Sequence, residues 1–281
     1  MVLLFYLKIL VGFGWSLVKH SMLRGIFSIL FFAISVCAAA QIRSGTFVIG
    51  RCEIYELKGS DIIVADTLIM MDSSRLKLNK AKRENYIRAK VAIFGKSTFI
   101  DGRGVTGIQG KTGTKGRTPF GPCHAGQAGR DGARGTDGGA GVNLFLYLEK
   151  IVVNGNLVVD LSGGNAGDGG DGGEGGGGSP GTMHCSGGNG GPGGDGGSGG
   201  TGGKGGILTF GVGEPDVIKT LIGSQVVVNL LGGNFGYGGI AGIGGSPGLG
   251  PSKGHGVKGK PGKSGDKGRP GTNGGIQFEQ Q

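Results

Sequence analysis

The stretch GGNGGPGGDGGSGGTGGKGG, from Gly187 to Gly206, has glycine at two of every three positions without an exception. A chain with three residues per turn points every third side chain in the same direction, which is the geometry of polyproline II. A face made only of glycine lets neighbouring backbones approach closely, but ordering so much glycine costs conformational entropy. Because polyproline II has no internal hydrogen bonds, we expect a dense network of bonds between neighbouring segments to offset that cost.

The triplet pattern recurs elsewhere in the chain, which has 281 residues, 70 glycines and only 9 prolines. Three glycine tracts cover residues 102–141, 163–206 and 232–275, and each is interrupted once near its middle. Flexible linkers keep no fixed period, so arms of similar length argue against disorder. We therefore predict three hairpins with six extended arms.

Apolar, β-branched segments between the tracts align with one another. They read AIFGKSTFID (92–101), IVVNGNLVVD (151–160) and TLIGSQVVVN (220–229). The equivalent apolar positions are Ile93, Val152 and Leu221, followed by Ile100, Val159 and Val228. Their alternation has the period of a strand, and units that stack only on their neighbours are typical of a solenoid. We predict an all-β fold, with β-solenoid coils at 41–101 and coils bearing glycine hairpins over 102–281.

The three hairpins differ in glycine content. The second tract is G-G-x, with two glycine faces, whereas the first and third are mostly G-x-y, with one. A middle tier needs glycine toward both neighbours, so the second hairpin is expected between the others in a slab two arms wide and three deep. Its charge is −3, against +4 and +5 for the first and third hairpins, which predicts mutual attraction of the tiers.

The first 40 residues form a separate region. From Met22 onward, Arg24 provides a positive start, residues 26–36 an apolar core, and Ala38 to Ala40 a small-residue cleavage site. This pattern is typical of a secretory signal peptide and predicts a secreted or cell-surface protein, with Met22 as a candidate start. Residues 1–21 are then interpreted as lying upstream of the true start. The alternative is that this N-terminal stretch is an uncleaved membrane anchor, the chain's one expected contact with a membrane.

With these features the chain resembles bacterial collagen-like glycine-repeat proteins. More specifically, it resembles the polyglycine-II sandwich or bundle domains of phage tail-fibre adhesins and of a glycine-rich arthropod antifreeze protein. The resemblance covers residues 102–275 and rests on G-G-x and G-x-y arms with interrupted tips. It implies that receptor contacts lie in the tips at 117–125, 177–187 and 249–255. The candidate binding residues are Pro119, Phe120, His124, Met183, His184 and His255.

Cysteine and histidine gather at these tips. In a three-tier stack the first two tips are adjacent, which favours a Cys123–Cys185 disulfide between tiers in an exported protein. The alternative is a zinc-like metal site, whose ligands would come from Cys123, His124, His184, Cys185 and His255. The third cysteine, Cys52, is expected to be a buried free thiol. Beyond this alternative we expect no cofactor.

Two sets of acidic residues are candidates for chemistry. Asp101, Asp160 and Asn229 end the three aligned segments and should form a ladder that caps the turn into each hairpin. The alternative is carboxylate chemistry on glycosidic bonds. Asp168, Asp171 and Glu174 suggest a calcium tract, but residues three apart in this helix lie about 9 Å apart. One Ca²⁺ needs nearer ligands, so we expect a solvated row.

These features favour an exported, non-enzymatic structural or adhesive protein. The chain from Gln41 on has 26 Lys and Arg against 19 Asp and Glu, which predicts an anionic partner such as a cell-surface polysaccharide, and no nucleic acid. The basic residues proposed to meet it are Lys258, Lys260, Lys263, Lys267 and Arg269. The alternatives are an ice- or surface-binding protein, a collagen-like triple-helical trimer, and a polysaccharide-active β-solenoid enzyme.

Overall fold

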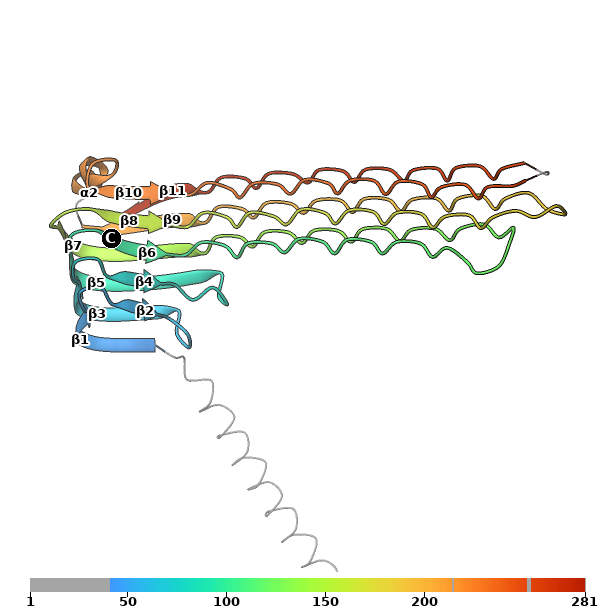
Figure 1. Cartoon of the computed structure of the whole chain (residues 1–281). Coiled ribbons are helices and arrows are strands. Elements are labelled where there is room, and N and C mark those ends of the chain that lie inside the picture. Colours follow the sequence, from blue (N-terminus) through green and yellow to red (C-terminus); the bar gives the residue numbers. More distant parts are fainter. Residues whose placement is uncertain (1–40, 214, 252–253, 281) are drawn as a thin grey trace, which may run out of the picture. The chain divides into compact units, whose positions relative to one another are not determined.

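The computed structural model describes residues 41–213, 215–251 and 254–280 (Figure 1). The predicted signal peptide or anchor at 1–40 lies outside the described residues. Within the described part, no helix has the length and apolar character needed to cross a membrane.

The described chain is almost entirely strand and extended arm, and all its paired strands are parallel, so the all-β prediction is confirmed. The six-stranded sheet follows chain order: β1 (Gln41–Ile49), β3 (Ile62–Met70), β5 (Glu84–Phe94), β7 (Asn143–Val153), β9 (Ile207–Val212) and β11 (Gly275–Gln280). The five-stranded sheet contains β2 (Ile54–Glu56), β4 (Arg75–Lys77), β6 (Thr98–Asp101), β8 (Leu157–Asp160) and β10 (Val226–Asn229). Each strand pairs with the next strand but one along the chain.

The apolar side chains of both sheets form one core. Along β3 and β5, buried and less buried residues alternate, as expected for strands with one covered face. The largest fully buried side chains include Ile63, Leu68, Phe94, Leu146 and Phe210. Burying each such side chain contributes about 1.5–3 kcal/mol, so this core holds the base from which the glycine arms extend.

Most of the predicted strand equivalences are confirmed by the register. Ile93 lies opposite Val152, and Val159 lies between Ile100 and Val228. The prediction for Leu221 was wrong, because this residue ends a helix, α2 (Pro215–Leu221).

A short helix replaces the expected strand for a physical reason. Ile218 and Leu221, three residues apart, contact the core from one helix face. Asp216 lies in the first turn and Lys219 in the last, where each charge favours the helix dipole, and their side chains are 3.1 Å apart. At residues 220–221 the helical spacing of apolar residues therefore decides the structure, and not the similarity to the two aligned strand segments.

Backbone amides join each glycine arm to its neighbours. Gly104 N donates to Ser162 O at 2.8 Å, from the first hairpin to the second. Gly163 N donates to Leu231 O at 2.9 Å, from the second hairpin to the third, and both patterns repeat at every third residue. The second hairpin thus bonds to both others, and the hairpins lie one above another (Figure 1).

The arms approach so closely that side chains are excluded between them. A Cβ on Gly170 would meet the carbonyl oxygen of Lys111 in the first hairpin, and a Cβ on Gly197 would meet that of Ala133. Gly197 N also donates to Gly170 O at 2.8 Å, across the second hairpin. Each of these glycines is therefore required by backbone packing.

Asp and Asn side chains of the second hairpin accept hydrogen bonds from backbone amides of the third. Asp168 Oδ1 accepts from Tyr237 N, and Asp171 Oδ1 accepts from Ile240 N, each at 2.7 Å. On the other arm of the second hairpin, Asp195 Oδ1 accepts from Lys263 N at 2.7 Å. In the predicted acidic row, Asp168 and Asp171 are thus exposed and bonded to the backbone of the third hairpin, whereas Glu174 is exposed and bonds to Lys115 of the first.

The turns between the two sheets explain an error about Cys52, which was expected to be buried. Cys52, Ser73 and Ser97 follow β1, β3 and β5 at the same spacing and share a left-handed conformation, with φ of 57°, 57° and 56°. Cys52 N donates to Asp72 O at 3.0 Å, so the turns stack at the surface. The Cys52 thiol is consequently free and exposed.

The close packing of the arms predicts a large effect of one methyl group. Gly170→Ala should lower the free energy of unfolding by about 3 kcal/mol or more, because rigid backbone of the first hairpin occupies the space that its Cβ needs. Gly59→Ala is the matched control, since a Cβ there meets nothing within 4 Å. Denaturant unfolding followed by circular dichroism measures both. Equal stability of the two variants would contradict the packing described.

Candidate functional site

The hairpin tips lie at the end of the arms farthest from the sheets (Figure 1). Large apolar side chains are open to solvent there: Phe120 is 96% exposed and Met183 75% exposed. His124, His184 and His255 are exposed as well. These side chains make the tips the candidate contact surface expected from the sequence.

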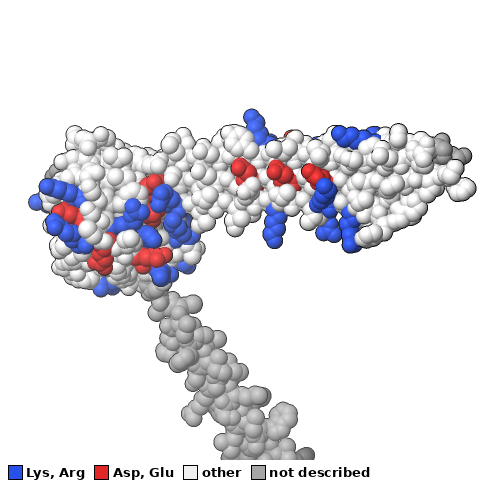
Figure 2. Space-filling model, in the orientation of Figure 1, with Lys and Arg blue, Asp and Glu red and all other residues white. Residues whose placement is uncertain are grey.

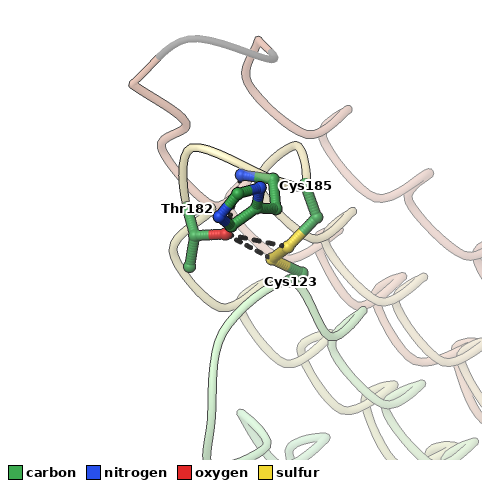
Figure 3. The surroundings of a disulfide bond; sticks show 4 residues. Cys123, Thr182 and Cys185 are labelled. Carbon is green, nitrogen blue, oxygen red and sulfur yellow. Dashed lines mark hydrogen bonds between the residues drawn. A yellow bond between two sulfur atoms is a disulfide. The ribbon is translucent and has the colours of Figure 1, made fainter.

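A disulfide joins the first two tips. Cys123 and Cys185 are bonded, with their Cα atoms 6.1 Å apart and 62 positions of sequence between them (Figure 3). Cys123 has a left-handed backbone with φ of 67°, and its N–H donates to Pro180 O at 2.8 Å. The bond therefore crosses from the first hairpin to the second, at the adjacent tips.

Two hydroxyl side chains that the sequence analysis did not single out support this junction. Thr182 Oγ1 lies 3.3 Å from Cys185 Sγ, and a disulfide sulfur can only accept, so the hydroxyl donates (Figure 3). Ser179 is buried and its hydroxyl donates to Pro119 O at 2.8 Å, fixing the first tip against the second. Their sequence signal is weak: both are small polar residues in the break around Cys185.

The tips do not assemble the alternative metal site in this structure. The sulfurs of Cys123 and Cys185 are bonded to each other and are not thiolate ligands. His255 Nδ1 accepts a hydrogen bond from Gly250 N at 3.1 Å, within its own tip. Among the residues that the structure describes, no group of three or more His, Cys, Asp or Glu is arranged to hold a metal ion.

The predicted ladder of polar residues is present at the start of the hairpins. Asp101 pairs with Asp160, which pairs with Asn229, in neighbouring strands of the five-stranded sheet. Asp160 Oδ1 accepts from Ser162 N at 3.0 Å, and Asn229 Oδ1 accepts from Leu231 N at 3.3 Å. Asp101 makes the same turn with Arg103 N at 3.2 Å, so the prediction of capping is confirmed.

Asp101 differs from the other two because its side chain is only 4% exposed. Burial raises the pKa of Asp101, but hydrogen bonds from Arg103 and the charge of Lys80 outweigh that effect and hold the pKa below its usual value. Arg103 contacts both carboxylate oxygens, at 3.1 and 3.0 Å. A carboxylate fixed in its ionised form is suited to binding cations and poorly suited to donating a proton.

Acidic side chains on the arms are mostly engaged with other arms. Figure 2 shows acidic side chains in a line along the arms, with basic side chains on both sides. Glu174 pairs with Lys115 at 2.7 Å, between the second hairpin and the first. The predicted basic residues of the third hairpin are exposed, and Lys267 Nζ lies 5.7 Å from the centre of the Phe235 ring.

Comparison with known proteins gives little. No protein-family model matches this chain, and no curated protein matches it. Among solved structures it is similar to the springtail antifreeze protein from Granisotoma rainieri, described as a nine polyproline type II helical bundle whose crystal waters match the ice lattice. The identity is 23%, the match covers 64% of this chain and 95% of that chain, and the TM-score is 0.13. At that score the likeness carries no argument about fold or function.

Removing the disulfide should destabilise the whole protein. Replacing both Cys123 and Cys185 by Ser opens a loop of 62 positions, which the loop-entropy relation converts to about 4 kcal/mol of unfolding free energy. Cys52→Ser is the control, since this exposed thiol closes no loop. Denaturant midpoints measure the effect, and intact mass after alkylation with and without reductant counts the free thiols. In the chain from Gln41 on, three free thiols without reductant, together with stoichiometric bound zinc, would instead favour the metal site.

The ionised Asp101 predicts acid sensitivity. Because its folded pKa lies below the reference value of 3.8, its contribution to stability is complete above that pH and is lost as the pH falls through the lowered pKa. We expect Asp101→Asn to flatten the fall in urea midpoint between about pH 5 and pH 2. Asp266→Asn, at an exposed position on the third hairpin, is the control. An unchanged slope in Asp101→Asn would contradict the assignment.

Proposed function

We propose that this chain is an exported, non-enzymatic structural protein that adheres to a surface through its hairpin tips. Its architecture would be a β-solenoid base carrying a six-arm polyglycine-II bundle. In-register parallel pairing of neighbouring strands within each sheet supports the solenoid. Backbone hydrogen bonds between arms at every third residue support the bundle.

Mechanically, the arms suit the task of holding a contact surface away from the base. Polyproline-II segments rise about 3.1 Å per residue, so an arm of some sixteen residues spans about 50 Å. Backbone bonds to adjacent arms at every third residue oppose bending of any single arm. A binding surface at the far end of such a bundle is presented at a fixed distance and orientation.

The observation that carries the proposal is the chemistry of the tips. Phe120 and Met183 are largely exposed on two tips that a disulfide fixes together. Burial of these two apolar side chains on binding would be favourable, so together they suit a contact surface. Fixing the tips in advance lowers the entropy that binding would otherwise cost.

Export is supported by two independent features. The signal-like sequence from Met22 to Ala40 precedes the first strand, and disulfides persist chiefly in oxidising compartments. The absence of catalysis is supported by Asp101, whose carboxylate is held by Arg103 and flanked by further cations. This environment opposes the role of proton donor, one of the two carboxyl roles that the enzyme alternative requires.

Adhesion can be tested with beads coated with the full chain. Retention under flow is measured on alkylated, neutral dextran, polygalacturonate and phospholipid surfaces. On the surface that retains the native protein, combined Phe120→Ser and Met183→Ser should lower retention about tenfold, since two large apolar contacts are lost. Val105→Ser with Ile108→Ser is the matched control, because these side chains are 65% and 73% exposed on an arm. Equal retention of the two double variants would contradict binding by the tips.

A further inference from the structure

A second group of residues outside the tips is arranged for binding, at the base of the first hairpin. Two neighbouring hollows of about 510 and 550 Å³ lie where the five-stranded sheet passes into the arms, and both are lined by Lys80 and Arg103. Hollows of about 300–1,000 Å³ accommodate molecules larger than a single small ion. The pair therefore offers a continuous surface for a ligand longer than one chemical group.

A buried carboxylate organises the wall between them. The Asp101 side chain, 4% exposed, lies 3.8 Å from Arg75 Nη1, 3.8 Å from Lys80 Nζ and 3.0 Å from Arg103 Nη2. A buried charge needs such partners, and one carboxylate here gathers three cations. The three cationic side chains remain 38%, 38% and 46% exposed, so they are within reach of a ligand.

The three cationic side chains are held in place, but not all of their hydrogen-bond donors are used. The Arg75 guanidinium lies over the Phe99 ring at 4.4 Å from its centre, and Arg103 binds Asp101 through two nitrogens. At 3.8 Å, Arg75 and Lys80 attract Asp101 without a hydrogen bond. Within the described chain neither side chain donates a hydrogen bond, which leaves directed donors for an oxygen-rich anion.

The surrounding charge favours an anion as well. The lining residues of the two hollows include five cations and three carboxylates, which leaves a net charge of +2. Figure 2 shows basic side chains gathered beside acidic ones over the five-stranded sheet, close to where the arms begin. An arginine held on an aromatic ring is the preferred partner of carboxylate, sulfate and phosphate oxygens.

We propose that Arg75, Lys80 and Arg103 form a preorganised site for the carboxylate or sulfate groups of an acidic polysaccharide. The two hollows in series fit successive units of such a polymer. The choice of a glycan over another polyanion rests on the export proposed above. The site is separate from the tips, so the protein would hold an acidic matrix at its base and a second surface at its far end.

Affinity measurements with the purified full chain test the site. The probes are polygalacturonate for carboxylates, dextran sulfate for sulfates, neutral dextran, and single-stranded DNA of matched charge. We expect Lys80→Gln and Arg75→Gln each to weaken binding of the preferred acidic glycan about tenfold, since each removes one charged donor. Lys111→Gln, at an exposed position on the first hairpin outside both hollows, changes the net charge equally and should leave the affinity unchanged. Thermal unfolding checks that Arg75→Gln is folded, and Lys80→Gln carries the test if it is not.

The outcomes separate this site from the tips and from unspecific charge. Equal weakening by Lys111→Gln, or no weakening by Lys80→Gln, would overturn the site. Tighter binding of single-stranded DNA than of either acidic glycan would overturn the ligand class. The Phe120→Ser and Met183→Ser variant should bind the acidic glycan as the native chain does, because the tip residues do not line the hollows.

Discussion

The structure depends on backbone segments that approach more closely than any side chain permits. An extended arm with three residues per turn forms no hydrogen bonds within itself. Its backbone amides must therefore bond to other arms. At Gly197 the amide bonds to Gly170 across the second hairpin, while the position of a Cβ is occupied by the backbone of Ala133. Glycine is therefore the condition for the hydrogen-bond network, and the network offsets the entropy of ordering glycine.

The strands supply what the arms lack, which is a register. Gly102 N donates to Asp160 O and Leu161 N to Asn229 O, directly after the paired strands β6, β8 and β10. Two residues further on, Gly104 N donates to Ser162 O in the same manner. The parallel ladder of the sheet thus continues into the arms without a break. The packing of apolar side chains in the core therefore sets the register of the arms. The arms themselves are mostly glycine and have few side chains that could set it.

This division explains what the sequence could and could not predict. Strand equivalences such as Ile93 with Val152 were accessible because alternation and spacing repeat. Leu221 was misassigned because a helical face, set by Ile218 and the core, competes with the strand pattern. The exposed thiol of Cys52 follows from a stacked turn that composition does not encode. Arg75, Lys80 and Arg103 come from different parts of the chain and meet around Asp101, so their proximity could not be predicted from the sequence.

The negative charge of the second hairpin serves hydrogen bonding to the third hairpin as well as attraction between hairpins. Its outward residues are often Asn or Asp because their short side chains reach the amides of the next tier, as Asn165 does for Asn234 and Asp168 for Tyr237. Glu174, one methylene longer, pairs with Lys115 instead. Most acidic side chains of the arms therefore make hydrogen bonds or ion pairs between hairpins. The donors of Arg75 and Lys80 at the base of the first hairpin and the exposed side chains of Phe120 and Met183 at the tips take no part in these bonds.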